Sequence, residues 1–242
     1  MKLLQGRGAL ITGASRGLGR AIARALAREG AAVACMARPG DELTRAVEEL
    51  TSSGAQAIAV PADITIEDQV AHAIQTAISK LPNLDILVLN AGTWQGAPIV
   101  ETSESLWDSL IDLNLKGAFL ALKHSIPALK SRGSGTVVGI ASLGALVGQP
   151  GSAAYAASKW GLRGLLESAA LELKPHRIRV TVVYPHNIHS SGPAIDAAER
   201  DRKIEPEEIA DLVTLACSAP SHVAIGNVTI LPIASGIRDS MR

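Results

Sequence analysis

The sequence has very few aromatic residues, no excess of charge of either sign, and only two cysteines. Aromatics make up 2% of the 242 residues, so aliphatic side chains must fill the core that a 47% hydrophobic content allows. The 23 basic and 23 acidic residues balance to a formal net charge of zero. The chain therefore lacks the basic excess that binding to nucleic acid or to an anionic membrane surface requires, and neither partner is expected.

The two cysteines and the apolar runs exclude further classes of protein. Cys35 and Cys217 are far apart and form no CxxC pair, so buried thiols are favoured over a disulfide or a reactive site. No apolar run reaches the roughly 18 residues of a membrane span. A strand follows the N-terminus at once and leaves no room for a signal peptide. A cytoplasmic protein without a metal site is expected.

The sequence does contain a regular alternation of short apolar runs and amphipathic segments, with no linker or internal repeat. This alternation predicts one domain over residues 1–242, with an α/β fold: a Rossmann-like, doubly wound parallel sheet of about seven strands with helices on both faces. Ligands of such sheets bind at the carboxyl ends of the strands. The expected strands are 7–12, 31–37, 56–61, 85–89, 135–141, 178–184 and 227–231, and the expected helices are 17–29, 41–53, 67–81, 104–131, 155–174 and 206–218.

A glycine-rich segment joins the first strand to the first helix. In such a turn, backbone N–H groups at the start of the helix bind an anion, and glycines let the backbone approach it closely. Tight turns between strand and helix also need glycine, but the position near the N-terminus favours a dinucleotide site. The expected phosphate contacts are Gly13, Ser15, Arg16, Gly17, Leu18 and Gly19.

The end of the second expected strand bears on the choice of cofactor. An acidic residue there would bind the ribose hydroxyls of NAD, but the sequence has Ala37 followed by Arg38. Arg16 and Arg38 together offer two guanidinium groups for a 2′-phosphate. The alternative is that both arginines are merely solvated. NADP(H) is the expected cofactor.

Polar and small residues follow two other strands. Asp63, with Ile64 after it, either accepts a hydrogen bond from an adenine amino group or caps a turn or helix. The small residues of the segment 90–92 would let a cofactor ribose approach; they are Asn90, Ala91 and Gly92. Asn114 lies inside a long helical pattern, where asparagine is disfavoured and needs partners. It is either structural or marks a kink that frees backbone groups for a water chain.

Tyr155 and Lys159 are one helical turn apart, so they share a helix face. A nearby ammonium group favours the phenolate, so we expect the pKa of Tyr155 to fall toward neutrality, where a phenol can exchange a proton with a substrate oxygen. The same spacing is common on surface helices. Ser142 ends the fifth strand, and a hydrolytic use of it is disfavoured because no histidine or carboxylate is placed to activate it.

Taken together, these marks resemble the short-chain dehydrogenase/reductase family over essentially the full chain. The resemblance rests on Thr12-Gly-x-x-x-Gly17-x-Gly19, Asp63, Asn90-Ala-Gly92, Asn114, Ser142 and Tyr155-x-x-x-Lys159. It implies that Tyr155 is the general acid/base, that Lys159 binds the nicotinamide ribose and lowers the pKa of Tyr155, and that Ser142 holds the substrate oxygen. Asn114 would complete a proton relay through water. Asp63 and Ile64 would lie by adenine, Asn90, Ala91 and Gly92 by the ribose, and Pro185, Ile188 and Ser190 on the nicotinamide side.

The implied function is that of an NADP-dependent oxidoreductase that interconverts a carbonyl and a secondary alcohol by hydride transfer. The alternatives within the family are a 3-oxoacyl-carrier-protein reductase and a 3-hydroxy acid or semialdehyde dehydrogenase. A non-catalytic NADP-binding regulator is the alternative from another class. The resemblance also implies a small-molecule substrate and a homotetramer or dimer, formed through the helices that carry Asn114 and Tyr155.

The chain departs from the family around residues 186–205. His186 stands where a glycine usually follows Pro185, and Ser190 stands where a threonine is usual. The segment is short for a substrate lid, which predicts an open pocket. For each pocket candidate taken alone, structural packing is the competing interpretation. The expected substrate contacts are Trp94, Ser142, Leu143, Gln149 and His186.

Overall fold

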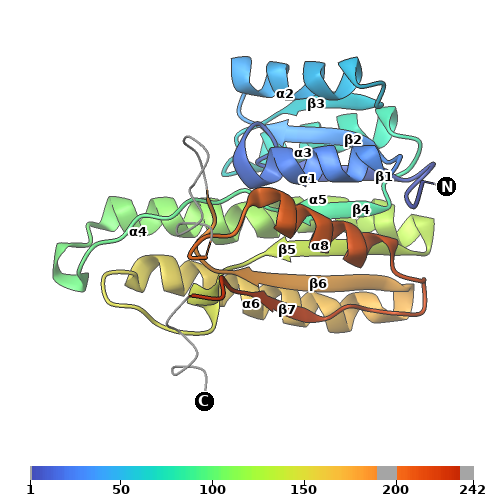
Figure 1. Ribbon diagram of the computed structural model, residues 1–242. Helices are drawn as coiled ribbons and strands as arrows, with labels where there is room; N and C mark the ends of the chain where they lie inside the picture. The colour runs from blue at the N-terminus through green and yellow to red at the C-terminus, as the bar shows by residue number, and fades with distance from the viewer. Residues whose placement is uncertain (1, 190–200, 235–242) are drawn as a thin grey trace.

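The computed structural model describes residues 2–189 and 201–234, so the predicted cofactor contact Ser190 lies outside the described residues. Seven parallel strands form one sheet in the order β3-β2-β1-β4-β5-β6-β7 (Figure 1). The order of addition reverses between β1 and β4, and this switch point is where open α/β sheets bind ligands. The strands are β1 (Gly8–Thr12), β2 (Ala32–Ala37), β3 (Ala57–Pro61), β4 (Ile86–Leu89), β5 (Gly135–Ile140), β6 (Ile178–Pro185) and β7 (Asn227–Ile230).

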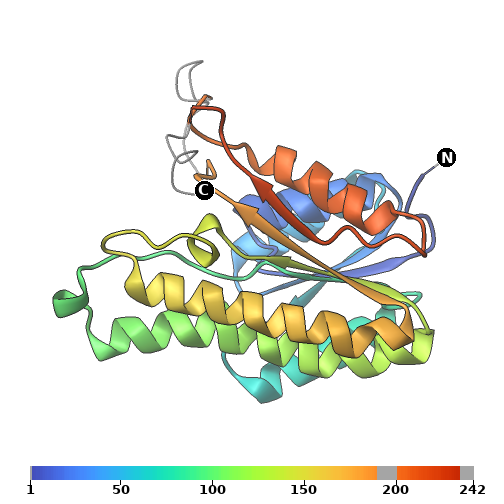
Figure 2. The same cartoon turned by 90° about the horizontal axis from the view of Figure 1, so that it is seen from below.

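Helices cover both faces of the sheet, which confirms the predicted fold class. In Figure 2, α1 and α8 lie above the sheet, while α4, α5 and α6 run beneath it. α1 packs against α8 on the first face, and α3 packs against α5 on the second. The helices are α1 (Gly17–Arg28), α2 (Asp41–Ser52), α3 (Glu67–Lys80), α4 (Glu104–Ile111), α5 (Gly117–Arg132), α6 (Ala153–Leu173) and α8 (Pro206–Ser218).

The strands alternate between two aliphatic cores. In β1, Ala9 and Ile11 belong to the core beneath α1, α2 and α8, whereas Leu10 belongs to the core beneath α3, α5 and α6. Because both faces are covered, all five residues of β1 are buried and the strand reads as one apolar run. Both cysteines are buried in the first core as free thiols, and burial raises the pKa of each to about 12.

The segment expected as one helix over 104–131 contains an irregular turn. α4 ends at Ile111, a π-helical turn, η2, spans Asp112–Lys116, and α5 continues from Gly117. A π-helical turn widens the helix by one residue and breaks the regular hydrogen-bond ladder, and such turns recur at functional sites. Asn114 lies on this turn. The backbone is therefore distorted at Asn114 and does not continue as the one regular helix expected over 104–131.

Short 3-10 turns complete the described chain: η1 (Ile99–Glu101), η3 (Leu143–Ala145) and η4 (Lys174–His176). Of these, η3 follows β5 directly and leads toward α6, which begins at Ala153. Among residues 2–189 and 201–234, no helix combines the length and the apolar character that crossing a bilayer would take.

Candidate active site

The glycine-rich turn after β1 is packed too closely for side chains. A Cβ on Gly13 would lie 2.9 Å from Ala91 Cα, and a Cβ on Gly19 would lie 2.1 Å from the Gly13 carbonyl oxygen. Gly13 has φ 67, a left-handed conformation that glycine adopts without steric cost. The turn thus brings bare backbone to the N-terminus of α1, and these residues fit a phosphate-bearing cofactor.

Asn90 holds this turn in place. Its Nδ2 donates to the carbonyl oxygens of Thr12 and Gly13, at 2.9 and 3.3 Å. The backbone N–H groups of Asn90 and Ala91 both donate to the Thr12 hydroxyl, at 2.9 and 3.0 Å, and that hydroxyl donates to Val88 O. The side chain of Asn90 is therefore used to fix the turn. The part played by Thr12 was missed in the sequence, where it appears only as the first letter of the motif.

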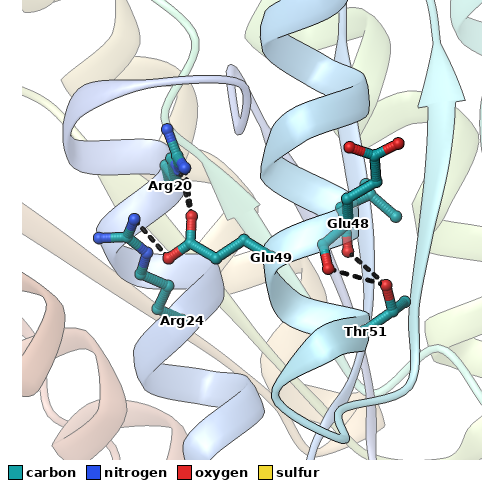
Figure 3. Close-up of polar contacts among 6 residues, drawn as sticks. Arg20, Arg24, Glu48, Glu49 and Thr51 are labelled. Atoms are coloured by element: carbon teal, nitrogen blue, oxygen red, sulfur yellow. Dashed lines mark hydrogen bonds and ion pairs between the residues drawn. The ribbon is translucent and has the colours of Figure 1, made fainter.

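Four arginines on and around α1 and the end of β2 divide into two groups. Arg20 and Arg24 form ion pairs with Glu49 of α2, and Figure 3 shows both guanidinium groups directed at that carboxylate. Arg16 and Arg38 are exposed, and no ion pair engages either of them within the described residues. Glu49 thus takes up two of the four cations, and the two that the sequence assigned to a 2′-phosphate stay available.

Asp63 and Ile64 follow β3, as expected, and each has a partner within the protein. Asp63 Oδ1 accepts hydrogen bonds from Thr65 N and Oγ1, at 2.9 and 2.8 Å. These bonds hold the pKa of the Asp63 carboxyl below its ordinary value, and the nearby charge of Arg38 lowers it further. Ile64 is buried and lies against Gly117 of α5. Asp63 therefore already caps a local turn through Thr65, and the charge of Arg38 is close enough to lower the pKa of its carboxyl.

Asn114 clamps the segment that follows β4. Its Oδ1 accepts from Thr93 N at 2.8 Å, and its Nδ2 donates to Thr93 O and to Ser158 Oγ, both at 3.0 Å. Both amide hydrogens and the carbonyl oxygen are in use, and the side chain is fully buried. A Cβ on Gly92 would lie 2.9 Å from Asn114 Oδ1 and 3.4 Å from Lys159 Nζ, so these three residues converge.

Ser158 connects this clamp to the helix that carries Tyr155. Its hydroxyl donates to Tyr155 O at 2.7 Å and accepts from Asn114 Nδ2. The sequence suggested only a small, helix-compatible spacer at this position. The available signal was that a serine inside a helix can bond back to a preceding carbonyl, which leaves its oxygen free to accept.

Tyr155 and Ser142 meet across the gap between β5 and α6. Ser142 precedes η3, and its Oγ accepts from Gly144 N at 3.1 Å. Burial raises the pKa of Tyr155 above its ordinary value, while a hydrogen bond with Ser142 lowers it to a smaller extent. The predicted fall in the pKa of Tyr155 is therefore wrong for this structure, because desolvation of the phenolate outweighs the favourable contact.

Lys159 is buried at one end of this group, with 5% of its surface exposed. Its Nζ donates to Ile140 O at 3.0 Å and lies 5.9 Å from the centroid of the Tyr155 ring. Burial lowers the pKa of Lys159 to about 8 because it disfavours the charged form. The ammonium group is thus held under the ring of Tyr155 by the last carbonyl of β5.

The expected substrate contacts differ widely in exposure. The Leu143 side chain is fully buried, Trp94 is 65% exposed, and Gln149 is exposed. His186 is half-buried, which lowers the pKa of its imidazole, and its backbone N–H donates to Ile230 O at 3.1 Å. The structure therefore places Leu143 in the core and leaves Trp94 and Gln149 at the surface.

The end of β6 is tied to the segment before α8. Pro185 ends β6, and Ile188 pairs with Ile204 in an isolated parallel bridge. His189 N donates to Ile204 O at 2.8 Å, and its Nδ1 lies 3.2 Å from Glu205 Oε2. The positive φ of 53 falls on Asn187 and not on His186, and asparagine tolerates that conformation better than most residues. This accounts for how the chain turns here without the usual glycine.

Comparison with known proteins agrees with this geometry. The short chain dehydrogenase family matches residues 7–199. The chain belongs to this family. It is 37% identical over 239 residues to the short-chain dehydrogenase/reductase eriH of Hericium erinaceus, covering 92% of this chain and 95% of that one. It is 39% identical over 180 residues to the 3-oxoacyl-[acyl-carrier-protein] reductase FabG of Staphylococcus aureus, covering 74% and 73%.

Two further likenesses complete this comparison. A metagenomic short-chain oxidoreductase, solved in complex with NADP, superposes with a TM-score of 0.84 at 36% identity and covers 95% of this chain and 98% of that one. Glycine betaine reductase ATRR of Emericella nidulans is 35% identical over 240 residues, but the chain spans only 19% of that protein's length. As a short-chain dehydrogenase, the protein is an oxidoreductase with a single Rossmann-like sheet.

Proposed function

We propose that the protein is an NADP-dependent reductase that interconverts a carbonyl compound and a secondary alcohol, with Tyr155 as the general acid/base. The observation that carries the proposal is the convergence of Ser142, Tyr155 and Lys159 at the carboxyl end of β5, beside the clamp made by Asn114. NADPH, when bound, supplies the hydride, so the cofactor is oxidised and the carbonyl carbon is reduced.

The chain's own residues handle the proton in this reaction. Ser142 lies close enough to lower the pKa of the Tyr155 phenol, and the Ser142 Oγ accepts a hydrogen bond from Gly144 N. Because burial raises the pKa of Tyr155, the phenol is protonated at neutral pH and serves as the acid for the reductive direction. Lys159, under the ring, supplies positive charge that stabilises the phenolate left behind.

The preference for NADP rests on the arginines. Arg16 and Arg38 are exposed at the adenosine end of the expected site, while Arg20 and Arg24 are held by Glu49. The relative solved with NADP supports the same cofactor. We expect Arg38→Asp to shift preference toward NAD, measured as the ratio of Kd values for NADPH and NADH. Equal affinity of the wild type for both would contradict this reading.

The decisive experiment is turnover of NADPH with a panel of ketones by the wild type and by Tyr155→Phe. The variant should retain NADPH binding and lose reduction, because only the hydroxyl is removed. A wild type that binds NADPH but reduces no ketone would favour the non-catalytic regulator. Reduction by Tyr155→Phe at the wild-type rate would show that the proton comes from elsewhere.

Substrates attached to an acyl carrier protein form the second candidate, supported by the likeness to FabG. An acidic carrier protein would dock on a basic surface near the active site, and the basic cavity in the described part of the chain lies too far from Tyr155 to serve. That cavity of about 570 Å³ is lined by Lys174, Arg177, Arg179 and His222. It lies where β6 begins, at the end of the sheet opposite Tyr155. Comparing a free 3-oxoacyl ester with the same acyl group on a carrier protein separates the two candidates.

The proposed enzyme assembles as a homo-oligomer, a tetramer or a dimer, through α4, α5 and α6. These helices carry exposed aromatic side chains, namely Trp107 at 43%, Phe119 at 45% and Trp160 at 48% exposure. Large exposed apolar residues on neighbouring helices are typical of protein interfaces. Light scattering after size exclusion measures the assembly, and Phe119→Glu should reduce the mass if this face is the interface.

A further inference from the structure

The basic cavity at the start of β6 plays no part in the proposed reduction. It lies between the end of α6, the first residues of β6 and the segment that joins α8 to β7, and its volume is about 570 Å³. Tyr155 is on the first turn of α6, whereas Lys174 follows its last residue, so roughly 30 Å of helix separates the two. Whatever occupies this cavity is therefore not the substrate held at Tyr155.

The charges that line the basic cavity are of one sign. Lys174, Arg177 and His222 are exposed, and none of their side chains has an ion pair or a hydrogen bond within the residues that the structure describes. No aspartate or glutamate is among the lining residues. Two cations and an imidazole are thus available to an anion, and no nearby carboxylate competes for them.

Arg177 occupies a position that local structure would assign to another residue. It ends η4 with φ 56, a left-handed conformation that is costly for residues other than glycine. Its N–H donates to Lys174 O at 3.0 Å, and its carbonyl accepts from Gly135 N at 3.4 Å. Cations also stabilise the end of a helix, and Lys174 does so for α6. A glycine would end the turn with less strain, so the guanidinium group stands here against the local preference.

The wall of the cavity that carries His222 is held in place by the protein. Arg179 also lines the cavity, but its Nη1 donates to the carbonyl oxygens of Ala219, Pro220 and Val223, at 2.7, 3.0 and 3.0 Å. These bonds fix the segment between α8 and β7 against β6. The cavity is therefore formed before any ligand enters, which lowers the entropic cost of binding.

An apolar cavity of about 320 Å³ adjoins the basic one. The two share Ala170, Leu171 and Val180, and the Leu171 side chain is 75% exposed. The carboxylate that lines the apolar cavity belongs to Glu167, which accepts a hydrogen bond from Arg163 Nε at 2.8 Å. An anion bound at the basic cavity thus has an uncharged surface beside it on which an apolar group can pack.

We propose that these two cavities form a second binding site, which takes a soluble phosphate monoester with an apolar substituent. Lys174, Arg177 and His222 bind the phosphate, whose charge of nearly −2 and three acceptor oxygens suit two cations and an imidazole donor. The substituent packs along Leu171 into the apolar cavity. Cavities of several hundred Å³ hold small molecules, and an acidic protein surface offers no apolar group to fill the second one.

The experiment is calorimetric titration of the whole protein with octyl phosphate, inorganic phosphate and octanol, at saturating NADPH so that the cofactor's own phosphate sites are filled. Octyl phosphate should bind at least about tenfold more tightly than either of the others. Lys174→Gln and Arg177→Gly should each weaken its binding about tenfold, because each removes one charge-assisted contact. Lys80→Gln, at an exposed lysine that ends α3, is the matched control and should bind like the wild type. Arg177→Gly should also unfold at a higher temperature, which excludes misfolding as the cause.

The outcomes decide between this site and its rivals. Equal affinity of the wild type and Arg177→Gly for octyl phosphate overturns the proposal, and so does equal affinity of the wild type for octyl phosphate and inorganic phosphate. Sedimentation with vesicles that contain phosphatidic acid, if Arg177→Gly abolishes it, would overturn the assignment to a soluble ligand in favour of a lipid headgroup. Tyr155→Phe should bind octyl phosphate like the wild type, so the site stands or fails independently of the proposed reductase function.

Discussion

The turn that opens α1 and the loop that leads into α6 lie at the same end of the sheet, yet they use glycine in different ways. At Gly13 and Gly19, any side chain would collide with backbone or with Asn90. At Gly148 and Gly151, a built Cβ meets nothing within 4 Å. The first region is fixed by backbone contacts that exclude any side chain, while the second is unobstructed at these two glycines.

The largest effect should come from Gly19→Ala, which tests the close-packed side of this comparison. Its Cβ would lie 2.1 Å from Gly13 O and 2.5 Å from Asn90 Nδ2, so the turn must move. We expect a loss of about 3 kcal/mol or more in the free energy of unfolding, and loss of NADPH binding.

The control for this change is Gly164→Ala, at an exposed glycine inside α6 with no atom near a built Cβ. Alanine is the better helix former, so this variant should gain up to about 1 kcal/mol. Denaturant unfolding and fluorescence titration with NADPH measure both. A Gly19→Ala protein with wild-type stability and affinity would show that the turn is not fixed as described.

Lys159→Met should increase stability while abolishing reduction. Burial lowers the pKa of Lys159 to about 8, against 10.5 for the free side chain, so below pH 8 the folded state bears the cost of a buried charge. Removing it should gain up to about 3 kcal/mol at neutral pH, less the lost bond to Ile140 O.

The stability gained by Lys159→Met should depend on pH, and the direction of that dependence follows from the lowered pKa of Lys159. Between pH 8 and 10.5 the unfolded chain keeps the proton that the folded protein has lost, so wild-type stability rises with pH and the gain of Lys159→Met shrinks. Unfolding at several pH values measures it, with the exposed Lys80→Met as control. A gain that does not change with pH would contradict the assigned cause.

Ser158→Ala tests the link between α6 and the clamp that Asn114 makes on the segment after β4. Without the hydroxyl, one amide hydrogen of the fully buried Asn114 loses its partner, which should cost about 1–3 kcal/mol. Ser125→Ala is the matched control, because the Ser125 hydroxyl is buried without a hydrogen-bond partner among the described residues. Thermal and denaturant unfolding should separate the two. Equal effects would show that the Ser158 contact contributes nothing.

The smallest effect should come from Glu49→Gln, at the α1–α2 contact of Figure 3. The pairs with Arg20 and Arg24 are partly exposed, so the cost should stay under about 1 kcal/mol and fall with added salt. Hydrogen bonding to Arg24 lowers the pKa of Glu49. The stability contributed by the two ion pairs is therefore present at neutral pH and is lost as the pH falls through the lowered pKa of Glu49.

Glu48→Gln supplies the control, since Figure 3 shows the Glu48 carboxylate directed away from both arginines. It should leave stability and its salt dependence unchanged. If Glu49→Gln instead weakens the preference for NADPH over NADH, the contact between α1 and α2 also helps to hold the adenosine end of the site. The released Arg20 and Arg24 would then have disturbed that end.

Much of the architecture followed from local patterns. Apolar runs and helical periodicity predicted all seven strands and their order of alternation with helices, and burial on both faces makes β1, β2 and β4 nearly continuous in apolar residues. The helix over 104–131 was the exception. Its π-helical turn carries Asn114, whose side chain bonds Thr93 and Ser158, partners distant in sequence.

The sequence by itself determined the class of fold, the glycine-rich turn and the spacing of Tyr155 and Lys159, because each depends on neighbours along the chain. Only the tertiary structure decided the balance of charge and space around them. Burial of the Tyr155 ring raises a pKa that helix spacing alone predicted to fall. Gly144 and Ser142 lie against the Tyr155 ring because the tertiary fold brings the turn after β5 up to α6, a contact that no local pattern encodes.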